Sequence, residues 1–405
     1  MHGFDDLSGH INRFSEMNIK RVVCGISGGV DSAVAALLLK RKGYDVVGLF
    51  MKNWDIRDEK GKCSSDEELE DAAWVCKTLN IPFHEVNFVK EYWNEVFSDF
   101  IKDYSSGITP NPDILCNRNV KFKHFLNYAI SKFGAQAIAT GHYAQTSVGY
   151  DLDTIDPRIG VSLLCSKDKE KDQTFFLSQI TQSALQKTIF PVGDLLKSEV
   201  KQIASQAGLE RIAKKRESMG ICFIGTRNFH NFIEEYIEPK EGPFIDVETG
   251  KQIGSHKGTH YWTIGQRCHI GGKHAAYFVC EVRPYSKEVI VAPGYDHPAL
   301  FSEVFRTDPC HWIQAPLQSV HQSKSFEAEF RFQHKHRLIG CSGYLEDSRF
   351  CVVKLSMPMR AITPGQYAVF YKDNVCLGSS RILEIGPSRF DLGVTEKIQF
   401  PKDLS

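Results

Sequence analysis

The stretch that most constrains this chain is "CGISGGVDSA", residues 24–33, where a glycine pair and two serines separate an apolar run from a helix-like run. Residues 21–26 predict a buried strand, and residues 32–43 predict a helix that ends at Gly43. Such a turn cradles an anion, because bare backbone N–H groups approach the oxyanion and the helix N-terminus adds positive potential. No lysine follows the glycines, which excludes a Walker A loop and argues against γ-phosphoryl transfer. A tight turn without a ligand is the plain alternative.

Strand-like and helix-like runs alternate from about residue 20 to residue 220. Residues 45–51 and 136–141 predict further strands, and residues 65–80 and 120–134 predict helices. This alternation is typical of an α/β domain with a mostly parallel sheet and helices on both faces.

The sequence pattern changes after about residue 240, where glycine and proline separate short β-rich runs. In "FEAEFRF", residues 326–332, apolar side chains alternate with charged ones, as in a half-buried strand. We therefore expect two small β-rich domains of the β-barrel type. The predicted organisation is an N-terminal extension over 1–20, a catalytic domain over 21–226, a central β-rich domain over 227–298 and a C-terminal β-barrel over 299–405.

Composition narrows the functional classes. Lysine plus arginine (49) balance aspartate plus glutamate (49), so any basic surface for nucleic acid must be local. No apolar run approaches the roughly 20 residues that span a bilayer, so we expect no membrane partner. The 12 cysteines contain no Cys-x-x-Cys pair, which argues against a zinc ribbon and an iron–sulfur site and favours a reducing compartment. The acidic N-terminus has no apolar core for a secretory signal and is a poor mitochondrial presequence.

Two cysteines stand in distinctive surroundings. In "TPNPDILCN", residues 109–117, Asp113 and Cys116 are three apart and would share a face of a helix. The carboxylate can accept the thiol proton, although its charge opposes thiolate formation. Cys222 follows a stretch, Lys197–Arg216, with six basic and two acidic residues. That stretch fits a phosphate backbone and a solvated helix face equally well, and its charge favours a Cys222 thiolate. A buried structural thiol is the plain alternative for Cys116.

These motifs together resemble the tRNA-specific 2-thiouridylases, which belong to the PP-loop ATP pyrophosphatase superfamily. The resemblance runs from about residue 20 to residue 385. It rests on "GISGGVDS" (25–32), "FMKNWD" (50–55), "TPNPDILCN", "ATGHYA" (139–144), "KDQTFFLSQ" (171–179), "SMGICFIG" (218–225), "TIGQR" (263–267) and "TPGQYAVFY" (363–371).

The resemblance implies roles for individual residues. Those implied to bind ATP are Gly25, Ile26, Ser27, Gly28, Gly29, Val30, Asp31, Ser32, Met51 and Gly141. Those implied to contact tRNA are Asn111, Pro112, Asp113, His142, Lys171, Asp172, Gln173, Arg331, Phe332 and Gln366, the first three at the target uridine. Cys116 matches the catalytic nucleophile, Cys222 matches the persulfide carrier, and Asp113 is our candidate for proton transfer. Asp31 is expected to help place Mg²⁺ or the triphosphate, and no resident metal site is predicted.

The implied reaction is ATP-dependent 2-thiolation of the wobble uridine, U34, in tRNAs of the Lys, Glu and Gln type. Adenylation would turn the C2 oxygen into a leaving group, and a persulfide on Cys222 would supply sulfur. Cys116 would either release sulfide from that persulfide or resolve the intermediate, and both routes end in a Cys116–Cys222 disulfide. A persulfide donor protein and a disulfide reductant are therefore expected partners.

Three positions depart from the common bacterial pattern. The run "GQRCHIGG" (265–272) is short, Phe332 stands where many members have tyrosine, and Met219 precedes Gly220. The short run and "ESMG" resemble the animal mitochondrial branch, so we expect a mitochondrial protein, with the cytoplasm as the alternative. The rival functions are another PP-loop adenylating enzyme, such as an amide-forming synthetase, and a tRNA-binding protein with a degenerate nucleotide site.

Overall fold

The computed structural model describes residues 21–55, 64–215, 228–272, 275–315, 323–346 and 349–398. The chain divides into two compact units. The first unit comprises Met1–Tyr92 and Cys116–Phe223, and the second comprises Trp93–Leu115 and Ile224–Ser405. The short segment Trp93–Leu115, which carries the first part of the "TPNPDILCN" motif, is therefore part of the same unit as the β-rich C-terminal half.

The first unit is built on a parallel five-stranded sheet. Its strands are β1 (Arg21–Gly25), β2 (Asp45–Lys52), β3 (Phe83–Asn87), β4 (Ala137–Ala139) and β7 (Thr188–Ile189). They lie in the order β3-β2-β1-β4-β7 and every pair is parallel. β5 (Gln145–Thr146) and β6 (Leu163–Leu164) pair with each other in antiparallel fashion, outside this parallel sheet. The predicted parallel sheet is thus confirmed.

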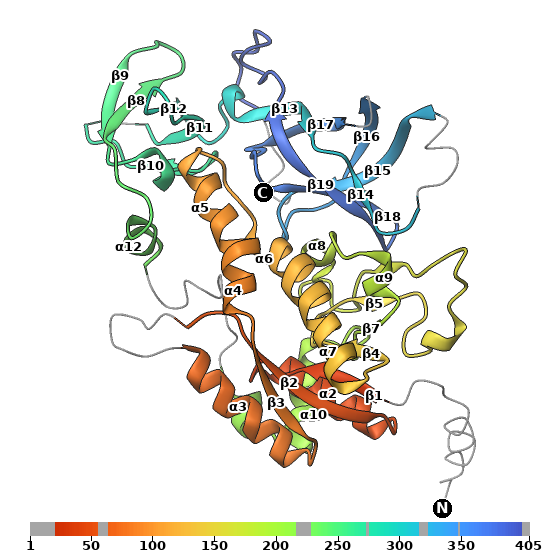
Figure 1. Cartoon of the computed structure of the whole chain (residues 1–405). Coiled ribbons are helices and arrows are strands. Elements are labelled where there is room, and N and C mark those ends of the chain that lie inside the picture. The colour runs from red at the N-terminus through yellow and green to blue at the C-terminus, as the bar shows by residue number, and fades with distance from the viewer. Residues whose placement is uncertain are drawn as a thin grey trace, which may run out of the picture. The chain divides into compact units, whose positions relative to one another are not determined.

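The first unit also contains a set of helices, some of which cover the sheet (Figure 1). They are α2 (Val30–Arg41), α3 (Ser64–Thr78), α4 (Val89–Tyr92), η2 (Cys116–Phe125), α7 (Leu126–Phe133), η3 (Leu152–Thr154), α8 (Thr174–Leu177), α9 (Gln182–Leu185), α10 (Lys197–Gln206) and α11 (Glu210–Ala213). The apolar run in the centre of the sheet is fully buried, as in Val22 and Cys24 at 0 % exposure, because helices shield parallel strands from water. The helix predicted over 120–134 corresponds to η2 and α7; the helical stretch begins before residue 120, and its η2 part is a wide π-helix.

The second unit contains a smaller β domain. Its strands are β8 (Gly242–Asp246), β9 (Gln252–His256), β10 (Arg267–Cys268), β11 (Tyr277–Arg283) and β12 (Glu288–Pro293). They lie in the order β10-β11-β12-β8-β9, and β8 runs parallel to β12. Short helices of the same unit are η1 (Trp93–Phe97), α5 (Ser98–Ser105), α6 (Pro112–Leu115), α12 (Phe229–Glu234) and η4 (Thr259–Tyr261).

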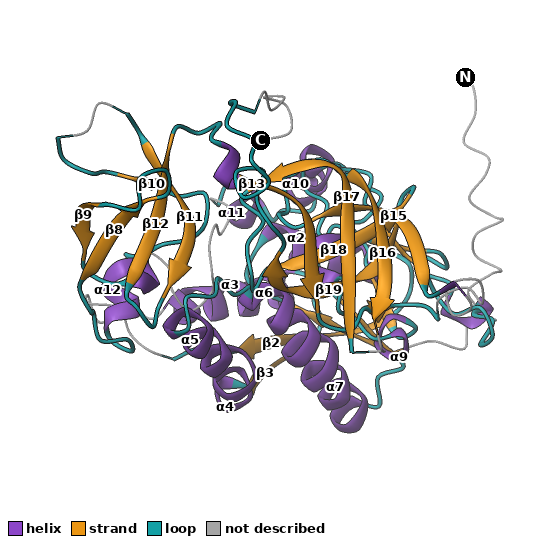
Figure 2. Cartoon of the chain, turned by 90° about the horizontal axis from the view of Figure 1, so that it is seen from above, coloured by secondary structure: helices purple, strands orange, loops and turns teal. Residues whose placement is uncertain are grey.

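The C-terminal strands close into a barrel (Figure 2). They are β13 (Phe301–Thr307), β15 (Ser325–Arg331), β16 (Ile339–Glu346), β17 (Phe350–Arg360), β18 (Tyr367–Lys372) and β19 (Val375–Ile385), preceded by η5 (Pro298–Leu300). The order β13-β17-β16-β15-β18-β19 closes through antiparallel pairing of β13 with β19, and the two-residue strand β14 (His311–Trp312) pairs with β19. Phe326 and Phe330 are buried while Glu327 and Glu329 are exposed, which confirms the predicted alternation in β15.

The predicted class, an α/β domain with a parallel sheet followed by two β-rich domains, is confirmed. Among the described residues, no helix is both long and apolar enough to cross a bilayer.

Candidate active site

The glycine-rich turn joins the carboxyl end of β1 to the first turn of α2. Gly28 has φ +74°, and a Cβ there would lie 2.6 Å from the carbonyl oxygen of Glu68 in α3. Only glycine tolerates both this backbone conformation and this approach. The turn therefore keeps its backbone bare because the packed α3 leaves no room for a side chain.

Two serines close the turn on itself. The Ser32 hydroxyl accepts a hydrogen bond from the Ser27 N–H at 3.1 Å and donates to the carbonyl oxygen of Gly29 at 3.0 Å. The two hydroxyl oxygens lie 3.2 Å apart. Ser32 is only 4 % exposed, so its hydroxyl mainly shapes the loop. This internal bracing holds the cradle in place before any anion arrives.

Asp31, in the first turn of α2, is neutralised by a partner from far along the chain. The Lys197 Nζ lies 2.8 Å from each oxygen of the Asp31 carboxylate, and the Tyr143 hydroxyl donates to one of them at 2.8 Å. The Lys197 side chain is 12 % exposed and that of Asp31 is 31 % exposed. A cation, an anion and a hydroxyl thus meet beside the glycine-rich turn.

The ends of neighbouring strands complete the cradle. A Cβ on Gly141, just after β4, would lie 2.5 Å from the Ser32 backbone nitrogen and 2.7 Å from the Asp31 carbonyl carbon. Met51, near the end of β2, brings its Cε within 3.8 Å of the point where a Cβ on Gly25 would stand. In open parallel sheets, ligands bind at this carboxyl edge. The structure brings all the predicted nucleotide-binding positions together here.

The basic stretch singled out in the sequence is largely paired within the first unit. Besides Lys197, Arg211 and Lys215 each place a nitrogen 2.6 Å from a carboxylate oxygen of Asp71, whose side chain is 8 % exposed. These pairs hold α3 beside α11 and the residue Lys215 that follows it. The three side chains therefore serve internal ion pairs, which neither of the two sequence interpretations anticipated.

Predicted tRNA-contacting residues of the first unit are anchored by hydrogen bonds. Asp172, 3 % exposed, accepts from the Ser166 N–H at 2.9 Å, and the Gln173 side-chain oxygen accepts from the Tyr143 N–H at 3.0 Å. Lys171 is half-buried next to them. Asp172 and Gln173 therefore shape the loop, and their contact with tRNA stays a prediction.

His142 follows Gly141 and lies in a polar, enclosed environment. Its Nδ1 is 2.8 Å from the Thr140 hydroxyl, and its Nε2 is 3.5 Å from the Lys121 Nζ. Burial, together with the Lys121 charge, holds the pKa of His142 well below its usual range. The imidazole is therefore neutral at physiological pH, and it can donate or accept a hydrogen bond without carrying charge.

The "TPNPDILCN" motif spans a change of helix type. α6 begins at Pro112, a favoured first helical residue, and the Asn111 side chain caps it by accepting from the Ile114 N–H at 3.3 Å. Cys116, 4 % exposed, is the first residue of the π-helix η2. π-Helical turns are frequent at functional sites. Because the helical repeat widens at Cys116, the shared face with Asp113 stays a prediction, and Cys222 lies outside the described residues.

The predicted tRNA contacts of the C-terminal barrel differ in exposure. The Arg331 guanidinium donates to the Tyr371 hydroxyl at 2.9 Å and to the His334 carbonyl oxygen at 2.9 Å. Phe332 is 0 % exposed, and its ring stacks on that of Phe330 with a 6.0 Å centroid separation. Any contact of Phe332 with tRNA would therefore have to use its backbone.

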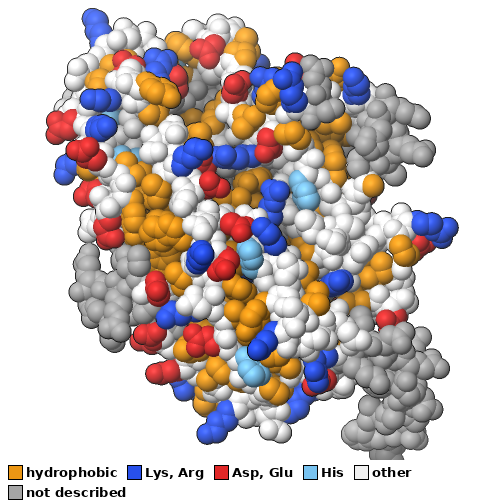
Figure 3. Space-filling model, viewed as in Figure 1, with side chains coloured by type: hydrophobic (Ala, Val, Ile, Leu, Met, Phe, Trp, Pro, Cys, Tyr) orange, Lys and Arg blue, Asp and Glu red, His pale blue; other side chains and the backbone are white. Residues whose placement is uncertain are grey.

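The distribution of charged side chains and of possible metal ligands limits what the candidate site can bind. On the face shown in Figure 3, basic and acidic side chains lie interspersed, in keeping with the balanced composition. Within the described ranges, no group of three or more His, Cys, Asp or Glu side chains is arranged to hold a metal ion. A Mg²⁺ ion at Asp31 would need additional oxygen ligands from the phosphates of a nucleotide, which is the usual arrangement for this ion.

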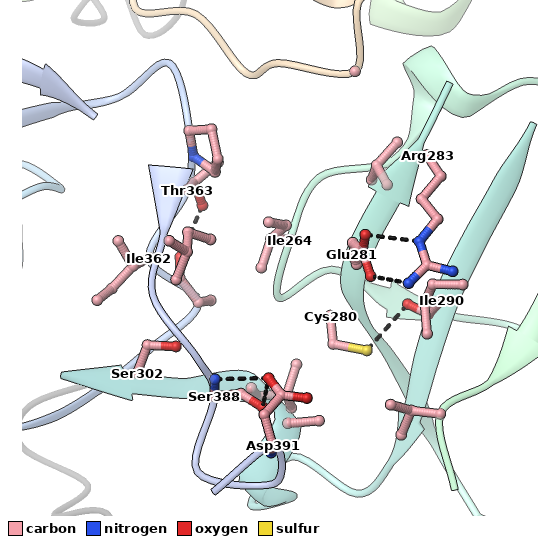
Figure 4. A pocket seen from close by; sticks show the side chains of 18 of the residues that line it. Ile264, Cys280, Glu281, Arg283, Ile290, Ser302, Ile362, Thr363, Ser388 and Asp391 are labelled. Atoms are coloured by element: carbon pink, nitrogen blue, oxygen red, sulfur yellow. Dashed lines mark hydrogen bonds and ion pairs between the residues drawn. The ribbon is translucent and has the colours of Figure 1, made fainter. Parts of the chain in front are cut away.

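A cavity of about 550 Å³ lies in the second unit, and Thr109 and Pro364, which neighbour the predicted site residues Asn111 and Gln366, form part of its lining (Figure 4). Its lining includes Cys280, Glu281 and Arg283. The Cys280 thiol donates to the Ile290 carbonyl oxygen at 3.3 Å, and burial raises its pKa to about 12. This thiol is therefore protonated and unreactive at neutral pH.

Sequence reasoning missed two residues of the candidate site. Lys197 was counted only as part of a basic stretch, and Tyr143 drew no attention. Lys197 stands at the start of α10, and Tyr143 follows β4. These positions point to the site only once the end of β4 is known to lie next to the glycine-rich turn. Both contact Asp31 directly.

Comparison with known proteins supports the geometric picture. Three family models match the chain in succession: the tRNA methyl transferase HUP domain over residues 20–226, the tRNA methyl transferase PRC-barrel domain over 230–293 and the aminomethyltransferase beta-barrel domain over 302–382.

Curated relatives match nearly the whole chain. Mitochondrial tRNA-specific 2-thiouridylase 1 of Gallus gallus is 51% identical over 397 residues, which is 92% of this chain and 94% of the relative. The Drosophila melanogaster protein of the same name is 48% identical over 382 residues, 94% of this chain and 98% of the relative. The tRNA-specific 2-thiouridylase MnmA of Alkaliphilus oremlandii is 45% identical over 370 residues, 90% of this chain and 97% of the relative. By this identity and coverage, the chain belongs to the tRNA-specific 2-thiouridylase family of enzymes.

Proposed function

We propose that this protein catalyses ATP-dependent 2-thiolation of the wobble uridine, U34, of mitochondrial tRNAs. The observation that carries the proposal is the glycine-rich turn between β1 and α2, which Gly28 and Gly141 allow to pack tightly because a Cβ at either position would meet neighbouring backbone. Beside it stands the Asp31–Lys197 pair, which offers one group for a cation and one for a phosphate. The mitochondrial setting is supported by the printed names of the relatives from chicken and fly.

ATP supplies the activating group. The pyrophosphate end is assigned to the turn Gly25–Ser32, with Met51 and Gly141 at the nucleotide. Mg²⁺ is assigned to Asp31 and the phosphates together, which leaves Lys197 to face the departing pyrophosphate. Transfer of AMP to the C2 oxygen of uracil replaces a poor leaving group by a good one. Fixed charges at the point where negative charge develops are the most effective form of such catalysis.

Two thiols complete the sulfur transfer. In one route, the Cys116 thiolate attacks the inner sulfur of a Cys222 persulfide, which releases hydrosulfide to displace AMP from C2. In the other, the terminal persulfide sulfur displaces AMP and Cys116 then cleaves the sulfur–sulfur bond. Each route leaves a Cys116–Cys222 disulfide, which two electrons from a dithiol reductant return to thiols. Asp113 is assigned the proton transfer, and a persulfide protein is assigned as the donor.

The target base must leave the anticodon stack to reach such a site. Unstacking a base costs a few kcal/mol, and least in a single-stranded loop. We assign Asn111, Pro112 and Asp113 to the extruded uridine, and we assign His142, Lys171–Gln173, Arg331–Phe332 and Gln366 to the surrounding tRNA.

The decisive experiment is nucleoside mass spectrometry of unmodified tRNA incubated with the protein, ATP, Mg²⁺ and a sulfide or persulfide source. Wild type and Cys222→Ser are compared. A 2-thiouridine product from wild type alone supports the proposal. AMP release driven by an amide donor, without thiolation, would instead indicate an amide-forming enzyme. tRNA retention without AMP or product, in folded protein, would indicate a binding module.

A further inference from the structure

One turn of the C-terminal barrel holds the segment that carries the predicted base contacts. The Gln366 side-chain nitrogen donates to the carbonyl oxygens of Thr109 at 2.9 Å and Pro110 at 3.1 Å. Its side-chain oxygen accepts from the Asn111 side-chain nitrogen at 3.2 Å. The Thr109 N–H donates to the Pro364 carbonyl oxygen at 3.2 Å. All these residues belong to the second unit.

The proline spacing explains why an outside partner is needed. Pro110 and Pro112 have no N–H group, so the segment around Asn111 cannot form a regular backbone ladder, and donors to its carbonyl oxygens come from elsewhere. Buried backbone carbonyls without partners are costly. A single primary amide with two N–H donors and one acceptor can serve two of these carbonyls and the Asn111 amide together. Gln366 is such an amide.

The neighbouring glycine allows the close approach. Gly365 has φ +90°, and a Cβ there would lie 2.3 Å from Ile108 Cγ2 and 2.7 Å from the Thr109 carbonyl oxygen. The turn itself is braced on the barrel, since the Gly365 N–H donates to the Ile382 carbonyl oxygen and the Ile382 N–H donates to that of Gln366, each at 2.8 Å. The turn around Gln366, which holds the Thr109–Asn111 segment and is called the clamp below, is therefore fixed to the barrel by backbone hydrogen bonds.

Both ends of the Asn111 amide are thereby fixed. Its nitrogen donates to Gln366, and its oxygen accepts from the Ile114 N–H at 3.3 Å. A primary amide retains a second N–H and a second lone pair after these bonds. These remaining groups match a uracil edge, which offers a carbonyl acceptor next to an N–H donor. The direction in which they point is set by Gln366.

We infer that Gln366 is a positioning residue, which orients the Asn111 amide and the Thr109–Asn111 backbone for the target uridine before tRNA binds. This role goes beyond a contact with tRNA. It rests on the proposed function for its catalytic consequence, but the clamp itself is a property of the free protein and can be tested without substrate.

The first measurement is hydrogen exchange of the full-length protein without tRNA, read in a peptide that covers residues 108–116. Gln366→Met removes all three hydrogen bonds at similar side-chain volume. We expect exchange in this peptide to speed up by about tenfold, because local opening becomes easier. The matched control is Gln252→Met, since the exposed Gln252 amide donates only within β9, to the Gly254 carbonyl oxygen at 3.2 Å. That variant should leave the peptide unchanged.

The second measurement separates positioning from tRNA contact. In single-turnover thiolation, Gln366→Met should slow the chemical step by about tenfold or more, since small misplacement of reacting groups costs up to about 100-fold. The Kd for tRNA should change by less than about threefold. Gln366→Glu should behave similarly, because its carboxylate would oppose the two carbonyl oxygens.

Three outcomes would overturn the inference. Unchanged exchange with weaker tRNA binding would make Gln366 a tRNA contact alone. Unchanged exchange and unchanged rate would leave it without a role. Equal loosening in Gln252→Met would show that the effect is not local. If Gln366→Met does not fold, Gln366→Glu carries the exchange test. If wild type does not thiolate tRNA, the proposed function fails while exchange still reports on the clamp.

Discussion

At the scale of single residues, the candidate nucleotide site depends on groups that leave space and groups that hold charge. Gly28 and Gly141 provide the space, because the backbone of another segment passes where their Cβ atoms would stand. Asp31 and Lys197 hold the charge in a pair that is partly shielded from water. Each kind of residue makes a separate prediction.

Gly141→Ala should close the cradle. The added methyl group would meet the Ser32 backbone nitrogen at 2.5 Å, so the turn has to shift. We expect a loss of about 1–3 kcal/mol in the free energy of unfolding, as for other overpacked sites, and loss of ATP binding by calorimetry. Gly271→Ala is the control, since a Cβ there meets nothing within 4 Å. Undiminished ATP affinity in Gly141→Ala would contradict the assigned site.

Lys197→Met should impair AMP formation far more than it impairs stability. The pair with Asp31 is partly exposed, so the stability cost should stay within about 1 kcal/mol. Loss of a cation that faces developing charge typically costs about 100-fold or more in rate. AMP release with tRNA present is the readout, and Lys187→Met, which removes an exposed lysine, is the control. A rate within twofold of wild type would remove Lys197 from the phosphate site.

At the scale of elements, α3 acts as a wall of the candidate site. The Glu68 carbonyl oxygen in α3 limits Gly28, and Asp71, one turn further on, pairs with Arg211 and Lys215. The pairs tie α3 to the chain after α10. The contribution of these ion pairs to stability depends on burial, because buried pairs are less screened by salt than exposed ones.

Asp71→Asn should therefore destabilise the protein more than Asp45→Asn does. Asp71 has two cationic partners and an 8 % exposed side chain, whereas the Arg21–Asp45 pair is about half exposed at the same 2.6 Å separation. We expect a loss of about 1–3 kcal/mol for Asp71→Asn and under about 1 kcal/mol for Asp45→Asn. Urea unfolding of both variants at two salt concentrations gives the comparison. Equal losses would mean that burial of Asp71 adds nothing.

At the scale of the whole molecule, four histidines link folding to pH. Burial lowers the pKa of His142, His256, His260 and His336 from the ordinary value of 6.5. Below pH 6.5 the unfolded chain therefore binds more protons at these sites than the folded protein does. Their contribution to stability is present above pH 6.5 and is lost as pH falls toward the folded-state pKa values.

The free energy of unfolding should decrease between pH 7.5 and pH 5.5. Each fully linked proton contributes a slope of about 1.4 kcal/mol per pH unit. His336→Gln should reduce the slope, because glutamine, unlike the imidazole that packs against Phe332, takes up no proton on unfolding. Urea unfolding at a series of pH values measures both slopes. An identical slope in His336→Gln would exclude a contribution from this residue.

Local patterns predicted several elements of the fold. β1, β2 and α2 were expected within one or two residues of where they lie, because buried strands and capped helices carry strong short-range signals. The alternating β15 was also predicted correctly. The π-helical form of η2 was not predicted, because no short-range pattern specifies a widened helical repeat.

By itself, the sequence determined the α/β and β-rich classes, the glycine-rich turn, the two cysteine motifs and, through ordered motifs, the family. Only the tertiary structure decided which distant groups meet: Lys197 with Asp31, Arg211 with Asp71, and Gln366 with Asn111. The reason is physical. A strand, a turn or a cap depends on neighbours a few residues away, whereas these pairs join residues more than 100 positions apart. Packing alone brings them together.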